Sequence, residues 1–296
     1  MNRLWLLIDV DNIASRARHT TGDLENGTLV GVFRAIASLQ EFFQTRDVAF
    51  CFDGGPSKRA DLDSKYKETR KAKRRAYTPE ERAAFREYRR QLGALRATYL
   101  RQLGYRNIFC ETGYEADDLI AVLVKALPAG DEAVVVSSDQ DLFQLVRGCV
   151  RCYNPITRVQ TTLQSFTAKY GIKPAMWSDV KAIAGCKSDD IRGIEGIGEK
   201  RAIKFLRHEF APETKWHDLI TQNSTVWQFN LELTRLPFPG CPPLELRDNR
   251  PTVARWEALM DELDMPALRP HAPHGSLTPP PKVVSRYAPY RPRGSE

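Results

Sequence analysis

The sequence predicts an α/β fold with a parallel-type central sheet flanked by helices. Four short, nearly continuous apolar runs are typical of strands buried on both faces of such a sheet, and segments with helical periodicity separate them. Three of the runs end at or near an acidic residue, at the edge where open α/β sheets place their sites. The four runs are Leu4–Ile8, Val48–Phe52, Ile108–Cys110 and Ala133–Val136.

Length and composition fit a folded protein with its own core. The 296 residues correspond to one large domain or two modest ones, and 42% hydrophobic residues are too many for a disordered chain. The first apolar run meets Asp9 after five residues, so it is no signal peptide, and no run is long enough to cross a membrane. Six scattered cysteines indicate reduced thiols. We therefore expect a cytoplasmic protein, in a bacterium or, if phage-encoded, in its host.

Positive charge gathers in one stretch of the chain. The whole sequence has 44 Lys and Arg against 37 Asp and Glu, a net charge of +7. Between residues 58 and 106 the counts are 16 and 6, a net charge of +10, which leaves the remainder at −3. This asymmetry favours nucleic acid as the partner. A solvated helix face with many salt bridges is the alternative.

The basic stretch contains a predicted amphipathic helix. The segment 78–81, Thr-Pro-Glu-Glu, is a capping box with proline at the first helical position. After it, Phe85, Tyr88, Leu92 and Leu95 share one face. The other faces carry arginines that we expect to contact nucleic acid, namely Arg86, Arg89 and Arg90.

Acidic residues are the strongest chemical signal. Asp9 and Asp53 close two strands, and further acids follow at strand or helix ends. So many carboxylates in one pocket need a counter-charge, and Mg²⁺ or Mn²⁺ prefers such oxygen ligands. Beside a basic helix, two ions roughly 4 Å apart would suit phosphodiester hydrolysis. The remaining candidates are Glu115, Asp117, Asp118, Asp139, Asp141, Asp189 and Asp190.

Two further motifs suggest phosphate contacts. At the foot of the basic stretch, Lys67 and Arg70 could neutralise charge on a scissile phosphate, and Tyr66 could stack on a base. Further on, a glycine-rich turn precedes a helix whose amide groups would point at a phosphate. That turn and the cations behind it comprise Gly193, Gly196, Ile197, Gly198, Lys200 and Arg201.

Taken in order, these blocks resemble the flap endonuclease family over about residues 4–265. The likeness is greatest to the bacterial and bacteriophage 5′ nucleases, including the 5′–3′ exonuclease domain of bacterial DNA polymerase I. It implies a PIN-like fold with a catalytic domain at 1–184 and a basic helical arch at about 66–103. It also implies a helix-hairpin-helix-type duplex-binding region at 185–264. A proline-rich basic tail, expected to be disordered, would follow at 265–296. No polymerase portion follows, so a stand-alone nuclease is expected.

The resemblance also implies an activity and roles for the site residues. The enzyme would remove 5′ nucleotides and cut 5′ flaps of DNA, with RNA primers as further candidate substrates, leaving 5′ phosphates. It would act as a monomer in replication or repair. Lys67 and Arg70 would act on the phosphate, and a potassium ion would sit on the glycine turn. Asp9, Asp53, Glu115, Asp117 and Asp118 would hold one divalent metal; Asp139, Asp141 and Asp189 would hold the other.

The sequence departs from the family pattern in two places. Cys186 stands where an aspartate of the second metal site is expected, and Asp190 could restore an acid nearby. The hypothesis is that the second metal binds more weakly and that cutting needs more magnesium or prefers manganese. Near the first strand, Asp11 is expected to be a helix cap and no ligand.

Two other functions remain open from the sequence. A PIN-type single-strand ribonuclease would share the sheet and some carboxylates, but such domains are shorter and lack the arch and the glycine turn. A flap-DNA-binding relative with an impaired second metal site would owe its defect to Cys186.

Overall fold

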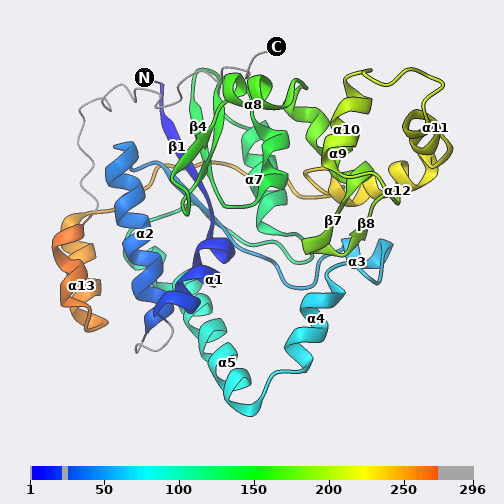
Figure 1. Cartoon of the computed structure of the whole chain (residues 1–296). Helices are drawn as coiled ribbons and strands as arrows, with labels where there is room; N and C mark the ends of the chain where they lie inside the picture. The colour runs from blue at the N-terminus through cyan, green and yellow to red at the C-terminus, as the bar shows by residue number, and fades with distance from the viewer. Residues whose placement is uncertain (1, 22–25, 273–296) are drawn as a thin grey trace, which may run out of the picture.

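The computed structural model describes residues 2–21 and 26–272 (Figure 1). Its main sheet has six strands in the order β3-β2-β1-β4-β5-β6. All neighbouring pairs are parallel except β5 and β6, which are antiparallel. The strands are β1 (Leu4–Asp9), β2 (Val48–Cys51), β3 (Ile108–Phe109), β4 (Glu132–Val136), β5 (Val150–Asn154) and β6 (Val159–Thr161).

The four predicted strands are confirmed, and β5 and β6 are additions. Strand β1 shows why a continuous apolar run indicates a central strand. Its side chains alternate between two cores: Leu6 and Ile8 join the core on one face, and Trp5 and Leu7 join the core on the other. Both faces are therefore dry, as a parallel sheet requires.

Helices cover both faces of the sheet (Figure 1). No helix in residues 2–21 and 26–272 is long and apolar enough to cross a membrane. The helices are α1 (Val10–Thr21), α2 (Gly27–Phe43), α3 (Arg59–Leu62), α4 (Glu68–Arg75), α5 (Pro79–Ala94), α6 (Leu100–Gln102), α7 (Ala116–Lys125), α8 (Leu163–Tyr170), α9 (Trp177–Ala184), α10 (Glu199–Leu206), α11 (Lys215–Gln222), α12 (Ser224–Thr234) and α13 (Val253–Glu262).

Helices α4 and α5 extend away from the sheet and meet at a narrow tip (Figure 1). The capping box at the start of α5 is present: Thr78 Oγ1 accepts from the Glu81 amide, and the Glu81 carboxylate accepts from the Thr78 amide. The far end of α5 is anchored because Tyr88 and Leu92 are buried in the core with Leu95. A π-helical turn, Leu95–Tyr99, then joins α5 to α6.

The chain after β6 builds a smaller core of its own and then returns to the sheet. Helices α9 and α10 flank a short hairpin, β7 (Gly185–Cys186) with β8 (Ile191–Arg192). Further on, Leu236 and Phe238 enter one core of the main sheet, and Trp256 on α13 enters the other.

The predicted tail at 265–296 is wrong for its first residues. Residues 265–272 include a 3₁₀ turn, Pro266–His271, and Met265 and Leu268 are buried in the core beside α2. The rest of the proposed tail, 273–296, lies outside the described residues.

Candidate active site

The acidic site lies at the carboxyl edge of the sheet, where β1, β2 and β4 end. Asp9 closes β1; its Oδ1 accepts from the Asn12 amide at 3.0 Å and its Oδ2 from Ser137 Oγ at 2.9 Å. Asp53 follows β2, and its Oδ1 accepts from the Ala116 amide at the start of α7 at 3.0 Å. Hydrogen bonds to nearby backbone amides and to Ser137 therefore hold both carboxylates at the same edge of the sheet.

The carboxylates of this edge repel one another. Burial, followed by the charge of Asp53, raises the pKa of Asp9 to about 8. Burial and the charge of Glu115 raise the pKa of Asp53. For Asp117, burial and the neighbouring acids raise the pKa well above its ordinary value. A divalent cation would relieve this repulsion.

One buried oxygen of the edge has no protein partner. Oδ1 of Asp117 is buried without a hydrogen bond, which is uncommon for a carboxylate and fits an atom reserved for a cation. The donor set around it is entirely oxygen, as Mg²⁺ and Mn²⁺ require. The unpartnered oxygen of Asp117 could therefore accept a divalent cation at this edge.

Asp118 was expected to help hold the first metal, but its oxygens are already occupied. Its side chain is fully buried and forms a two-pronged ion pair with Arg59, with both N–O distances at 2.7 Å. Oδ1 also accepts from the Phe238 amide at 2.7 Å, and Oδ2 accepts from the Glu115 amide at 3.1 Å. Asp118 therefore anchors the start of α7 to Arg59, and both of its oxygens are already hydrogen-bonded within the protein.

Arg59 was missed by the sequence analysis. It is 2% exposed and contacts Glu115 as well as Asp118, and its Nε donates to the Leu233 carbonyl at 2.8 Å. Among the many cations of the basic stretch, no sequence signal marks the one that is buried.

Lys67 links the acidic edge to Asp189 in the turn between β7 and β8, and Arg70 contacts Asp189. Lys67 Nζ bonds Glu115 and lies 3.7 Å from Asp189 Oδ1. Arg70 Nη2 lies 3.4 Å from the same oxygen, with about half of its side chain exposed. These two cations stand beside the acidic edge at the foot of α4, where a phosphate would need neutralisation.

The expectation that Tyr66 stacks on a base is wrong. Tyr66 is 3% exposed, and its ring packs against Cys186, Ile191 and Leu233. Its hydroxyl donates to Glu115 Oε2 at 2.8 Å. Tyr66 therefore orients the Glu115 carboxylate, and its buried ring is not accessible to a nucleic acid base.

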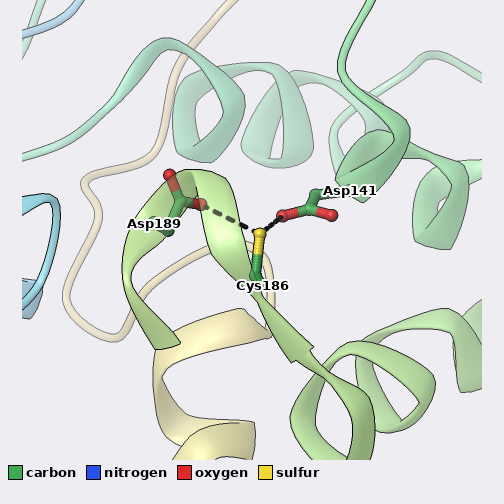
Figure 2. Close-up of side chains that lie close together, drawn as sticks. All are labelled: Asp141, Cys186 and Asp189. Carbon is green, nitrogen blue, oxygen red and sulfur yellow. Dashed lines mark hydrogen bonds between the residues drawn. The ribbon is translucent and has the colours of Figure 1, made fainter. Parts of the chain in front are cut away.

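A second group of ligands lies beyond β4 and in the β7–β8 hairpin (Figure 2). Ligand atoms of Asp141, Cys186 and Asp189 all lie within 4.8 Å of one another. Cys186 Sγ is 3.7 Å from Asp141 Oδ2 and 3.7 Å from Asp189 Oδ2. Asp139 caps the turn that holds Asp141, accepting from the Asp141 amide at 2.9 Å. Burial and the charge of Asp141 raise the pKa of Asp139.

Asp190 does not restore the acid of the second group. Its two oxygens accept from the Thr69 amide at 2.8 Å and the Thr69 hydroxyl at 2.6 Å. These bonds lower the pKa of Asp190. Thr69 is in the first turn of α4, so Asp190 caps that helix and ties α4 to the β7–β8 hairpin.

Asp11 is not the cap of α1, because Asp9 has that role. Asp11 Oδ2 instead accepts from the Asp53 amide at 2.9 Å, and Oδ1 lies 3.8 Å from an Arg89 nitrogen. Burial and the charge of Asp53 raise the pKa of Asp11 to about 7. A cavity of about 160 Å³ opens here between the acidic edge and α5, with Arg96 in its wall.

The arginines of α5 differ in how they are engaged. Arg89 faces Asp11, and Arg90 bonds both oxygens of Glu87 at 2.7 and 2.8 Å. Arg86 is exposed on the same helix.

The glycine turn divides into packed and open positions. A Cβ on Gly193 would lie 2.2 Å from the Ala184 carbonyl carbon, whereas one on Gly198 would meet nothing within 4 Å. Ile197 is buried in the small core, so its side chain is not available to DNA.

The two cations behind the glycine turn also differ. Arg201 donates to the Gly196 carbonyl at 2.7 Å and stacks on Trp216, while Lys200 is exposed. Helix α10 begins directly after Gly198, as expected.

Comparison with known proteins shows the family to which the chain belongs. The family model described as the 5′-3′ exonuclease, N-terminal resolvase-like domain, matches residues 4–171, more than half of the chain. DNA polymerase I of Pseudomonas aeruginosa is 32% identical over 209 residues, covering 68% of this chain and 22% of that protein. Thermostable DNA polymerase I of Thermus thermophilus is 39% identical over 134 residues, covering 45% of this chain and 15% of that protein.

Solved structures share the fold. T5 5′-exonuclease with bound zinc superposes with a TM-score of 0.69 at 23% identity, covering 92% of this chain and all of that one. The catalytic core of Rad2 in complex with DNA gives a TM-score of 0.55 at 13% identity, with 89% and 88% covered.

The α/β fold is that of these solved structures, with acidic residues at the carboxyl ends of its parallel strands. More narrowly, the chain belongs to the 5′–3′ exonuclease family, whose N-terminal resolvase-like domain matches residues 4–171. The chain spans about a fifth of the length of the DNA polymerase I relatives that it matches.

Proposed function

We propose that this chain hydrolyses DNA phosphodiesters near 5′ ends and at the base of 5′ flaps, leaving 5′ phosphates. One observation carries this proposal: the carboxylate edge adjoins Lys67 and Arg70 at the foot of a basic arch. A scissile phosphate between them would meet metal ligands on one side and fixed cations on the other.

The proposed metal ligands fall into two sets. Asp9, Asp53, Glu115 and Asp117 would hold one divalent ion, while Asp139, Asp141, Asp189 and Cys186 would hold another. Bound Mg²⁺ or Mn²⁺ would supply a hydroxide from water and stabilise the leaving oxygen. Asp118 would keep α7 and its ligands in place through Arg59, and Asp190 would keep α4 in place through Thr69.

This chain's own residues would orient the substrate. Lys67 and Arg70 can exchange their carboxylate partners for a phosphate oxygen once a metal neutralises those carboxylates. Arg86 would attract the single-stranded 5′ end along α5.

The region 185–264 would grip the duplex through the first backbone amides of α10, those of Glu199 and Lys200. A potassium ion there would use turn carbonyls other than that of Gly196, which Arg201 already bonds. We place the enzyme, as a monomer, in DNA replication or repair in a bacterial cytoplasm or that of a phage host. RNA primers would be possible substrates.

A cleavage assay tests the proposed function. The full chain would be mixed with a labelled 5′-flap duplex, a blunt duplex and a single-stranded RNA, in Mg²⁺ and then in Mn²⁺. Cutting near the flap junction, lost in Asp139→Asn and kept in the remote Asp261→Asn, supports the proposal. Cutting of the RNA alone would mean a ribonuclease, and tight flap binding with no cutting in either metal would mean a DNA-binding relative.

A further inference from the structure

Cys186 puts a sulfur into a ligand set that is otherwise oxygen. We propose that this sulfur is a metal ligand and that it makes the second site selective for thiophilic divalent cations such as Zn²⁺, Co²⁺ or Cd²⁺ over Mg²⁺. This proposal rests on the proposed function only in assuming that catalysis uses the second metal site. Which metal that site binds can be measured independently of nuclease activity.

The geometry around the sulfur fits direct ligation. In a tetrahedral site with a metal–sulfur distance of 2.3 Å and metal–oxygen distances near 2.1 Å, sulfur and oxygen lie about 3.6 Å apart. The two sulfur–oxygen distances to Asp141 and Asp189 are both 3.7 Å. With Asp139 capping the turn of Asp141 and not bound directly to the metal, the three direct ligands and one open position form the pattern of a catalytic zinc site.

Neighbouring cations orient the carboxylates of Asp141 and Asp189 toward the Cys186 sulfur. Asp141 turns Oδ1 to Lys181 at 3.3 Å, and its Oδ2 faces the sulfur. Asp189 turns Oδ1 to Lys67 and Arg70, and its Oδ2 faces the sulfur (Figure 2). Each carboxylate therefore keeps one oxygen on a cation and offers the other to the same point.

The hairpin holds Cys186 where it is needed. Cys186 is the last residue of β7, is 5% exposed, and pairs with Ile191 of β8. Its sulfur also lies 3.0 Å from Ser188 Oγ. Because the backbone is fixed on both sides of the turn, the sulfur can bind a cation with little rearrangement, releasing the thiol proton to solvent.

Ligand softness sets the expected selectivity. Thiolate sulfur favours zinc-like ions, whereas Mg²⁺ prefers carboxylate, carbonyl and water oxygens. Replacing one ligand should change metal affinity by at least the roughly 10–100-fold that outer-shell changes produce. Cys186→Asp should therefore bind Mg²⁺ about tenfold more tightly or better, and should lose part of its preference for Cd²⁺.

Co²⁺ titration of the metal-free full chain tests the sulfur ligand directly. Wild type should show a sulfur-to-cobalt charge-transfer absorption band that saturates with bound metal. Cys186→Ser should lack the band, and Cys186→Asp should bind Co²⁺, measured by calorimetry, without it. Cys149→Ser is the matched control, because Cys149 precedes β5 at the opposite edge of the sheet, and it should keep the band.

Either of two results would overturn the proposal: no sulfur band in wild type, or a band that survives Cys186→Ser. Flap cleavage in Mg²⁺, measured on the same preparation, separates this failure from failure of the proposed function. An active nuclease without the band would keep its function and lose only the sulfur ligand.

Discussion

Removing Arg59 should destabilise the protein more than removing any exposed cation. The Arg59→Ala variant leaves the Asp118 carboxylate buried with only two backbone amides as partners. It also removes the contacts to Glu115 and to the Leu233 carbonyl. Breaking a buried ion pair by deleting one partner costs about 3–5 kcal/mol, because a charge remains without compensation.

Urea unfolding of the metal-free full chain measures this loss. The matched control is Arg75→Ala, whose pair with Glu68 is exposed on both sides and should contribute under about 1 kcal/mol. A double-mutant cycle with Asp118→Ala should give a coupling free energy of roughly 1–3 kcal/mol.

The result bears on the role of Asp118. If Arg59→Ala cost no more than Arg75→Ala, the anchoring role would be refuted. If Asp118→Asn weakened Mg²⁺ binding at unchanged stability, Asp118 would be a metal ligand after all.

Three further predictions follow from single contacts. Gly193→Ala should lower stability by about 1 kcal/mol or more because its Cβ meets backbone, whereas Gly198→Ala should leave unfolding unchanged yet weaken duplex binding, measured by fluorescence anisotropy. Asp11 has a pKa of about 7 in the folded state, above its unfolded value, so the metal-free chain should lose stability as pH rises from about 4 to 7. Asp11→Asn should flatten that pH dependence and stabilise the chain at pH 8, on the order of 1–2 kcal/mol; an unchanged profile would contradict the assignment. Arg86→Ala should reduce the salt slope of DNA binding by about 1, and Arg90→Ala, whose charge is already paired, by less; equal slopes would show that this pairing does not matter.

The sequence was sufficient for the features that depend on local pattern. Continuous apolar runs identified the central strands because both faces of a parallel sheet are dry. Acids directly after those strands identified the edge, since parallel strands bring their carboxyl ends together. Strands β5 and β6 escaped detection because polar residues interrupt their apolar pattern, namely Arg151 and Asn154 in β5 and Gln160 and Thr161 in β6.

Long-range contacts decided what the sequence could not. Asp118 and Asp117 are adjacent and identical in type, yet one is fully engaged by Arg59 while the other keeps a free buried oxygen. Likewise, Tyr66 is adjacent to the cationic foot of the arch, but its ring turns into the hairpin core. Such differences arise from which segments pack together, and spacing along the chain does not encode them.

The most direct test of the central claim is single-turnover cleavage of a 5′-flap duplex in saturating Mg²⁺ by wild type and Lys67→Ala. Saturating protein removes effects on binding, so the rate reports the chemical step alone. Loss of the cation between the two carboxylate groups should slow cleavage roughly 10²-fold or more. Lys73→Ala, at an exposed position in α4, should cleave at the wild-type rate. Equal rates for wild type and Lys67→Ala would contradict the claim that the acidic edge and the foot of the arch act together on the scissile phosphate.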